Sequence, residues 1–118
     1  MKYLCLIYED ETLWQKMPKV EVDKLYAEYA AFKDNIKQSG YLVECNPLEP
    51  THETTTVRVR NGKVLTTDGP FVETKEQLGG YFLIEARDLN DAIQVASRIP
   101  SARLGGIEIR PIREINLR

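Results

Sequence analysis

The sequence predicts a single α+β domain of the ferredoxin-like, split βαβ type, with a β-hairpin inserted between its two halves. Three observations predict this fold: two strongly apolar strand segments, an amphipathic helix after each of them, and an Asn-Gly pair between two β-branched runs. The 118 residues have the size of one domain and can bury one contiguous core, so we expect one domain over residues 1–118.

The first half of the chain is expected to form β-α-β. Residues 2–8 lack polar alternation, which predicts a strand covered on both faces, and residues 41–45 predict a short second strand. The helix between them is expected at about 20–39, and Gly40 follows where a C′ glycine ends a helix. Its apolar stripe has 3-4-3-4 spacing: Val22, Leu25, Tyr29, Phe32 and Ile36.

The Asn61-Gly62 pair is the strongest hairpin signal in the chain, because a type I′ turn needs positive φ at both central residues. It predicts strands at 54–60 and 63–66. A two-residue turn also fixes the cross-strand pairs as Arg60 with Lys63, Val59 with Val64, and Arg58 with Leu65. Arg58 and Arg60 then share the face opposite Val57 and Val59.

The second half of the chain predicts another β-α-β unit. An apolar strand is expected at 81–86, and the following helix begins at the cap residue Asp88 and stops at Pro100. The inner stripe of this helix is predicted as Leu89, Ala92, Ala96 and Ile99. Residues 107–110 alternate as a last strand, which Pro111 marks as bulged or at an edge.

Two helices can cover only one face of the resulting sheet, although its central strands are apolar on both faces. A second copy of the chain, sheet against sheet, is the economical cover for the other face. We therefore expect a two-fold homodimer.

Composition excludes several classes of partner. A net charge of −2 gives no field that attracts nucleic acid or acidic membranes, so neither is expected as a partner. The apolar run at the amino terminus is too short for a signal sequence, and no apolar stretch approaches the roughly 20 residues that span a bilayer. The expected location is the cytoplasm.

Metal and thiol chemistry are not indicated. Cys5 and Cys45 stand forty residues apart, without a Cys-x-x-Cys pair or nearby histidines, so we expect no zinc site. Two buried, reduced thiols are the preferred interpretation, and no cofactor is expected.

Residues 67–80 combine a Gly-Pro turn with a dense group of charges. An Asx-turn at Asp68 would need the N–H of Pro70, which proline lacks, so the carboxylate must find another donor or face a pocket. Thr74 and Gln77 fit a capping box, which predicts one helical turn over 74–78 that projects Glu73 and Glu76 together. Asp68, Glu73 and Glu76 are thus candidate acid–base groups; the alternative is a solvated charged loop.

Three isolated side chains complete the inventory. His52, the single histidine, lies in a loop between strands and is expected to be exposed and not catalytic. Trp14 and Met17 follow the first strand and are interpreted as anchors of that segment to the helix, with a flap over a cleft as the alternative.

The segment Thr67-Asp68-Gly69-Pro70-Phe71-x-Glu73-Thr74-Lys75-Glu76-x-Leu78-Gly79-Gly80 resembles the signature of the DGPF-type branch of the YCII-related family. The resemblance extends over most of the chain and implies a ferredoxin-like fold that pairs into a dimeric α+β barrel. Some relatives in that family are small-molecule enzymes thought to use a His-Asp pair, with the histidine near the first helix. Residues 9–40 of this chain contain no histidine, so that pair does not carry over.

The resemblance and the charges together give the expected function. We expect a dimeric binder of a small polar or anionic molecule in a cleft beside the 67–80 segment, with these ligand-binding residues: Arg58, Asp68, Phe71, Glu73 and Lys75. The first alternative is an isomerase, lyase or hydrolase that uses Asp68, Glu73 or Glu76 as acid or base. The second is a non-catalytic accessory or regulatory module whose signature builds the dimer.

Overall fold

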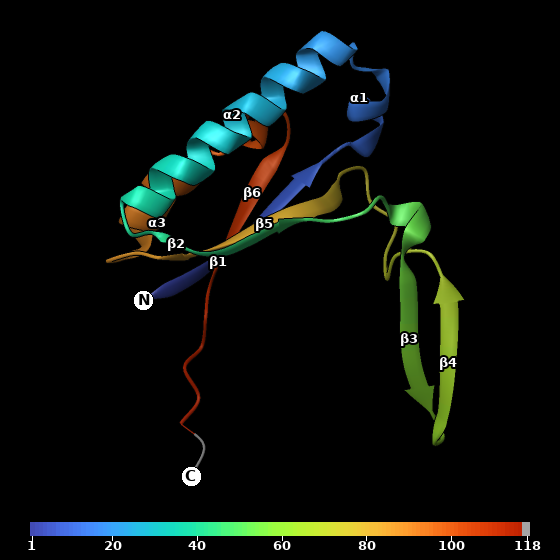
Figure 1. Cartoon of the computed structure of the whole chain (residues 1–118). Helices are drawn as coiled ribbons and strands as arrows, with labels where there is room; N and C mark the ends of the chain where they lie inside the picture. The colour runs from blue at the N-terminus through green and yellow to red at the C-terminus, as the bar shows by residue number, and fades with distance from the viewer. Residues whose placement is uncertain (117–118) are drawn as a thin grey trace.

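A computed structural model describes residues 1–116 of the chain. Its centre is a four-stranded antiparallel sheet in the order β2-β5-β1-β6, with α2 and α3 on one face (Figure 1). The elements of this body are β1 (Lys2–Glu9), α2 (Lys19–Gln38), β2 (Leu42–Pro47), β5 (Gln77–Glu85), α3 (Leu89–Ala96) and β6 (Gly106–Pro111). Each helix connects two parallel strands that a third strand separates, which is the predicted split βαβ arrangement.

Strand β1 shows how the two faces of the sheet differ. Tyr3, Cys5 and Ile7 are buried, whereas Leu4 and Leu6 between them are only half-buried. Because side chains alternate along a strand, the buried set points toward the helices and the half-buried set toward the open face. The prediction of a strand covered on both faces is therefore correct for one face of the single chain.

The core lies between the sheet and the helices. Phe32 of α2 meets the ring of Phe82 on β5 edge to face, with centroids 5.1 Å apart, and Ile36 and Ile84 are fully buried beside them. This confirms the predicted stripe of α2. The helix ends as expected at Gly40, whose φ is +81°. The N–H of Gly40 bonds the Lys37 carbonyl and that of Tyr41 bonds the Ile36 carbonyl, the two bonds of a Schellman motif.

A short helix that periodicity did not predict, α1 (Glu11–Lys16), follows β1. Asp10 caps it by accepting a hydrogen bond from the N–H of Thr12 at 2.9 Å. The ring of Trp14 lies 5.6 Å from that of Tyr26 on α2. This contact agrees with the interpretation of Trp14 as an anchor between the segment and the helix, but Trp14 also lines a cleft, so the alternative of a flap stays open.

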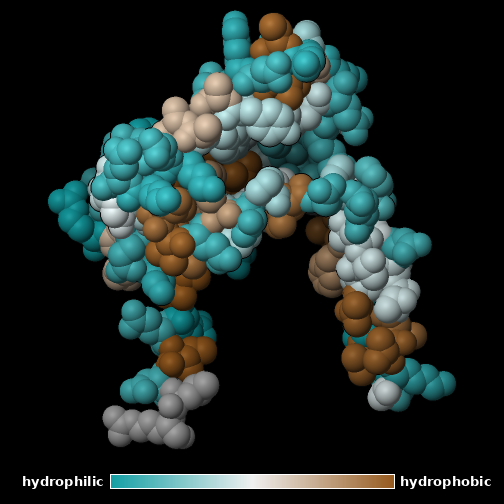
Figure 2. All heavy atoms as spheres, viewed as in Figure 1, coloured by the Kyte–Doolittle hydropathy of each residue, from teal (hydrophilic) through white to brown (hydrophobic). Residues whose placement is uncertain are grey.

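The hairpin of β3 (Thr55–Arg60) and β4 (Lys63–Asp68) forms a separate two-stranded sheet with the predicted register. Positive φ values of 52° at Asn61 and 75° at Gly62 confirm the turn. The hairpin and the C-terminal residues 112–116 extend from the body on the side away from the helices, like two arms of an arch (Figures 1 and 2). Both arms expose apolar side chains: Val57, Val59, Val64, Ile112 and Ile115.

Three local predictions are wrong. Helix α3 ends at Ala96 and not at Pro100, which instead begins a short 3₁₀ helix, Pro100–Arg103. Residues 74–78 form no helical turn, because β5 already begins at Gln77 and pairs there with Glu9 of β1. Leu89 is 50% exposed and does not belong to the inner stripe of α3, since it is the first residue of the helix and Asp91 takes the inward position of that turn. The predicted edge position of the last strand is confirmed by β6.

Both cysteines are free thiols. Cys5 is buried and Cys45 is half-buried, and burial raises the pKa of Cys5 to about 11.

No helix within residues 1–116 is long and apolar enough to cross a membrane.

Candidate functional site

A cleft of about 510 Å³ lies between α2 and the sheet, at the end where β1 stops and β5 starts. Five parts of the chain line it: the end of β1, helix α1, one face of α2, the segment 45–50, and the first residues of β5. A cleft of this volume is within the ordinary range for small-molecule sites.

Glu9, the last residue of β1, is the most unusual side chain of this cleft. It is 8% exposed, and its Oε2 atom is buried without a hydrogen-bond partner among the described residues. It lies there because the alternation that buries Cys5 and Ile7 continues to Glu9 and points its carboxyl group toward the helices.

Gly79 and Gly105 lie next to Glu9, but only Gly105 leaves no room for a side chain. A Cβ atom on Gly79 would lie 3.6 Å from Oε1 of Glu9, which is an ordinary contact. A Cβ atom on Gly105 would lie 2.0 Å from the carbonyl oxygen of Tyr8 and 2.8 Å from the Cα of Glu9, distances that no side chain can occupy. The chain around Gly105 therefore packs directly on the end of β1 and holds Glu9 in place.

Aromatic side chains form much of the remaining wall: Trp14, Tyr26, Tyr29, Tyr81 and Phe82. The ring of Tyr29 is parallel to that of Phe82 with centroids 6.4 Å apart, and its hydroxyl shares a hydrogen bond with Ser101. Burial, and then the negative charge of Glu9, raise the pKa of Tyr29. Glu9 and Tyr29 thus line the same cleft, and the Tyr29 hydroxyl already has a partner in Ser101.

The rim of the cleft is tied together by Glu11. Its backbone N–H donates to the side-chain oxygen of Gln77 at 3.0 Å, and its carboxylate accepts from both the N–H and the hydroxyl of Thr51. Glu49 also lines the cleft, and a hydrogen bond with the carboxyl of Glu53, together with the charge of that group, raises the pKa of Glu49. Lys33 of α2 is the cationic side chain of the lining.

The residues predicted as a site lie outside this lining. The guanidinium of Arg58 is 4.8 Å from the ring centroid of Phe71, which brings these two together on the hairpin side. Asp68, Glu73 and Glu76 are exposed to solvent. The hydrogen bonds from Thr12 lower the pKa of Asp10, the residue that caps α1, and the charge of Lys75 adds the weakest contribution in the same direction. The ligand-binding and catalytic roles of these residues stay predictions.

The 67–80 segment nevertheless borders the cleft. Its last four residues, 77–80, are the first residues of β5 and form part of the wall. At its other end the Gly-Pro turn is fixed by the backbone: Gly69 has φ +108°, its N–H bonds the carbonyl of Thr54, and its carbonyl accepts from the hydroxyl of Thr56 at 2.8 Å. The segment therefore joins the hairpin to the cleft.

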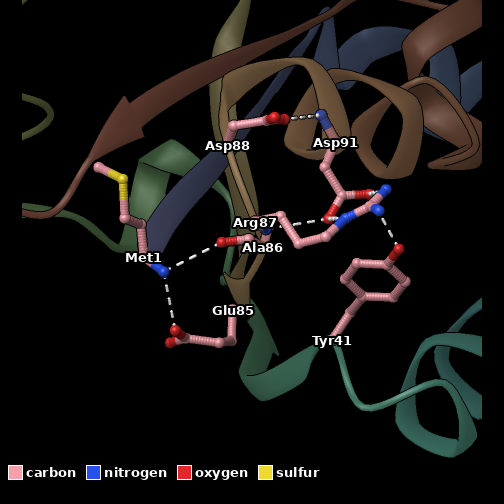
Figure 3. Close-up of polar contacts among 7 residues, drawn as sticks. All are labelled: Met1, Tyr41, Glu85, Ala86, Arg87, Asp88 and Asp91. Carbon is pink, nitrogen blue, oxygen red and sulfur yellow. Dashed lines mark hydrogen bonds and ion pairs between the residues drawn. The ribbon is translucent and has the colours of Figure 1, made fainter.

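A second buried carboxyl group, Asp91 at the start of α3, has a different environment (Figure 3). It is 6% exposed, and it accepts hydrogen bonds from the backbone N–H of Arg87 at 3.0 Å and the hydroxyl of Tyr41 at 2.9 Å. The guanidinium of Arg87 lies 3.4 Å away, and Asp88 caps the helix through the N–H of Asp91. The bond from the backbone N–H of Arg87, more than any other contact, lowers the pKa of Asp91.

The same region holds the amino terminus. The ammonium group of Met1 contacts the carboxylate of Glu85 at 2.8 Å and the carbonyl of Ala86 at 3.0 Å (Figure 3). With both oxygens of Asp91 bonded and the terminus paired, this cluster is a structural one.

Glu9 was not among the residues predicted from the sequence as a site. Residues 2–8 lack polar alternation, so the sequence does not say which side chains face the helices; the burial of Tyr3, Cys5 and Ile7 in the structure places Glu9 on the covered face. Within residues 1–116 no group of three or more His, Cys, Asp or Glu side chains has the arrangement of a metal site.

Fold and cleft together describe a small α+β protein with one helix-covered sheet face and a partly polar cleft. The chain matches the YCII-related domain over residues 1–116, and it belongs to the YCII-related family. It is 33% identical, over 114 residues, to an uncharacterized protein of Rhizobium meliloti (strain 1021), an alignment that covers 95% of this chain and 92% of the relative.

Proposed function

We propose that this YCII-related protein is a homodimer that binds a small polar molecule in the cleft beside the 67–80 segment. The single observation that carries the binding function is the carboxyl group of Glu9, which is buried in a cleft and whose Oε2 has no partner in the described part of the chain. Leaving a buried polar atom unpaired costs roughly 1–3 kcal/mol, so such groups in native proteins call for an explanation. A bound molecule that donates a hydrogen bond supplies one.

Binding is tested by filling the cleft. Ala27 and Ala30 are both exposed on α2, but only Ala30 lines the cleft. We expect pools of polar metabolites to shift amide NMR signals of Gly79 and Gly80 in the wild-type protein and in Ala27→Trp, but not in Ala30→Trp. Signal changes in all three proteins alike, or confined to residues far from the cleft, would contradict the proposal.

The dimer is supported by the open face of the sheet. Leu4 and Leu6 of β1 and Leu83 of β5 are half-buried there without a covering layer in the single chain. The two arms that project on this side expose apolar residues that a partner would cover, among them Val57, Val64 and Ile112. Two sheets packed face to face across a two-fold axis would form an α+β barrel, with each hairpin beside the partner subunit.

The dimer is tested by light scattering coupled to size exclusion. We expect the wild-type protein to have twice the mass of the chain at micromolar concentration, and Leu6→Lys, which puts a charge on the open face, to have the mass of one chain. Val20→Lys is the matched control, because Val20 is exposed on α2, across the molecule from that face. A monomeric wild-type protein would remove the proposal, and a dimeric Leu6→Lys variant would move the interface elsewhere.

A further inference from the structure

We infer that the molecule taken up by the cleft is a small organic amine in its protonated form, which donates a hydrogen bond to the carboxyl group of Glu9. This inference rests on the proposed binding function, since it names the class of molecule that the same cleft takes.

The first argument is the state of Glu9. Its Oε2 atom is shielded from solvent and has no hydrogen-bond partner among residues 1–116. The terminal torsion of a glutamate is broad, which allows either oxygen to turn toward a ligand. An ammonium group supplies both an N–H donor and a compensating charge, and charge-assisted hydrogen bonds are about twice as strong as neutral ones. A carboxylate or phosphate would instead place like charges together.

The second argument is the aromatic wall. Trp14, Tyr26 and Tyr29 come from two helices to the same cleft that Glu9 closes from the sheet. Aromatic faces attract ammonium groups, by about 0.5–1 kcal/mol in exposed sites and about 2 kcal/mol when the cation is desolvated. The negative faces of these rings do not attract an anion.

The third argument is the balance of charge in the lining. Three carboxyl side chains, Glu9, Glu11 and Glu49, line the cleft together with one ammonium side chain, Lys33. Glu11 is occupied by its bonds to Thr51, so its charge acts on the cleft while its oxygens are held at the rim. The excess of negative charge favours a cationic ligand over an anionic one.

The class of ligand is tested with three probes of the same size and shape: benzylammonium, benzyl alcohol and benzoate. Each is titrated into the full-length, isotope-labelled protein, and dissociation constants are read from the amide signals of Gly79, Gly80 and Tyr29. We expect benzylammonium to bind at least about tenfold more tightly than benzyl alcohol, and benzoate to give no shift of these signals.

Two glutamine variants assign the effect to Glu9. In Glu9→Gln the affinity for benzylammonium should fall about tenfold, to that for benzyl alcohol, because the charge and not the shape has been removed. Glu44 is an exposed residue of β2 that is not part of the lining, so Glu44→Gln should leave the affinity for benzylammonium unchanged. If Glu9→Gln fails to fold, Glu9→Asp is the second variant, because it keeps the carboxyl group but on a side chain shorter by one methylene. It should weaken the binding of benzylammonium and leave that of benzyl alcohol unchanged.

Two outcomes would overturn the inference. Tighter binding of benzoate than of benzylammonium in the cleft, with the benzoate affinity lost in Lys33→Gln, would mean that the cleft takes anions; the proposed binding function would then stand. If no probe shifts the cleft signals and the metabolite pools do not either, both the inference and the proposed function fall.

Discussion

Asp91 and Glu9 are two carboxyl groups of almost equal burial, 6% and 8% exposed, and they differ in what surrounds them. Asp91 is bonded by a backbone N–H, a guanidinium and a phenol hydroxyl, all from the chain itself. Glu9 has glycine backbone and aromatic rings as neighbours, and its buried Oε2 has no hydrogen-bond partner within residues 1–116. Burial alone does not distinguish a structural carboxylate from one available to a ligand; the supply of donors does.

The difference arises from local sequence. Asp91 follows Arg87 by one helical turn, so the backbone N–H and the guanidinium of Arg87 reach it as the helix starts. Glu9 ends a strand, where the adjacent side chain points to the opposite face and the nearest one on its own face, Ile7, has no donor to offer. Hydrogen-bond donors for Glu9 would have to come from other elements. The helices bring Trp14, Tyr26 and Tyr29 to the cleft, and the hydroxyl of Tyr29 already bonds to Ser101.

The largest effect is expected from the glycine behind Glu9. In Gly105→Ala the new methyl group would overlap the carbonyl of Tyr8, so the end of β1 must move, at roughly 3 kcal/mol or more of unfolding free energy. Gly106→Ala is the control, since nothing lies within 4 Å of its Cβ position. Urea unfolding of both variants measures the difference. Equal stabilities would show that the end of β1 is not held in this way.

The next effect concerns the bonded carboxyl group. Asp91→Asn keeps the shape but replaces an acceptor oxygen with an amide donor that faces the N–H donors of Arg87. We expect the melting temperature to fall by roughly 5 °C or more, whereas the exposed change Asp23→Asn on α2 should shift it by about 1 °C or less. Calorimetry on the two variants checks this, and a thermally neutral Asp91→Asn would remove the structural role.

The dependence of the unfolding free energy on pH below about 5 should report the ionisation of Asp91. The folded state lowers the pKa of Asp91, first through the N–H of Arg87, while the unfolded chain has an ordinary pKa near 3.9. The folded protein therefore keeps Asp91 ionised where the unfolded chain takes up a proton. Its contribution is complete above about pH 5 and is lost as the pH falls through the lowered pKa of the folded state.

The unfolding free energies of the wild-type protein and Asp91→Asn measure this contribution directly. Their difference should be constant between about pH 5 and 7 and should shrink steadily below about pH 4. A difference that stays the same down to pH 2 would mean that the ionisation of Asp91 does not stabilise the fold.

The sequence predicted most of the fold, because its signals are periodic or steric. The stripe of α2 and the Asn61-Gly62 turn leave few alternatives. The stripe is confirmed by the burial of α2, and the turn is confirmed together with the predicted residue pairs of the hairpin. The local capping pattern at 74–78 failed because pairing of β5 with β1 prevailed over it. Helix α1 was missed because six residues are too few for a periodic pattern.

The candidate site was harder to predict than the fold. The predicted acid–base groups were charged residues close together in sequence, such as Glu73 and Glu76, and in the structure these two are exposed. The cleft instead combines residues from β1, α1, α2 and β5, and such a combination depends on tertiary packing. The position of Glu9 on the covered face follows from the burial pattern of β1, which residues 2–8, without polar alternation, do not reveal in the sequence.

The most direct test of the contrast between the two carboxyl groups is the unfolding free energy of Glu9→Gln, measured in urea at pH 7 beside Asp91→Asn. If Glu9 is reserved for a ligand, its neutral variant should be as stable as the wild-type protein or more stable by up to about 1 kcal/mol, because a buried carboxylate is replaced by an amide of the same shape. Asp91→Asn should lose stability in the same experiment. A loss in Glu9→Gln as large as that in Asp91→Asn would show that Glu9 has a structural partner within the protein and would contradict the account.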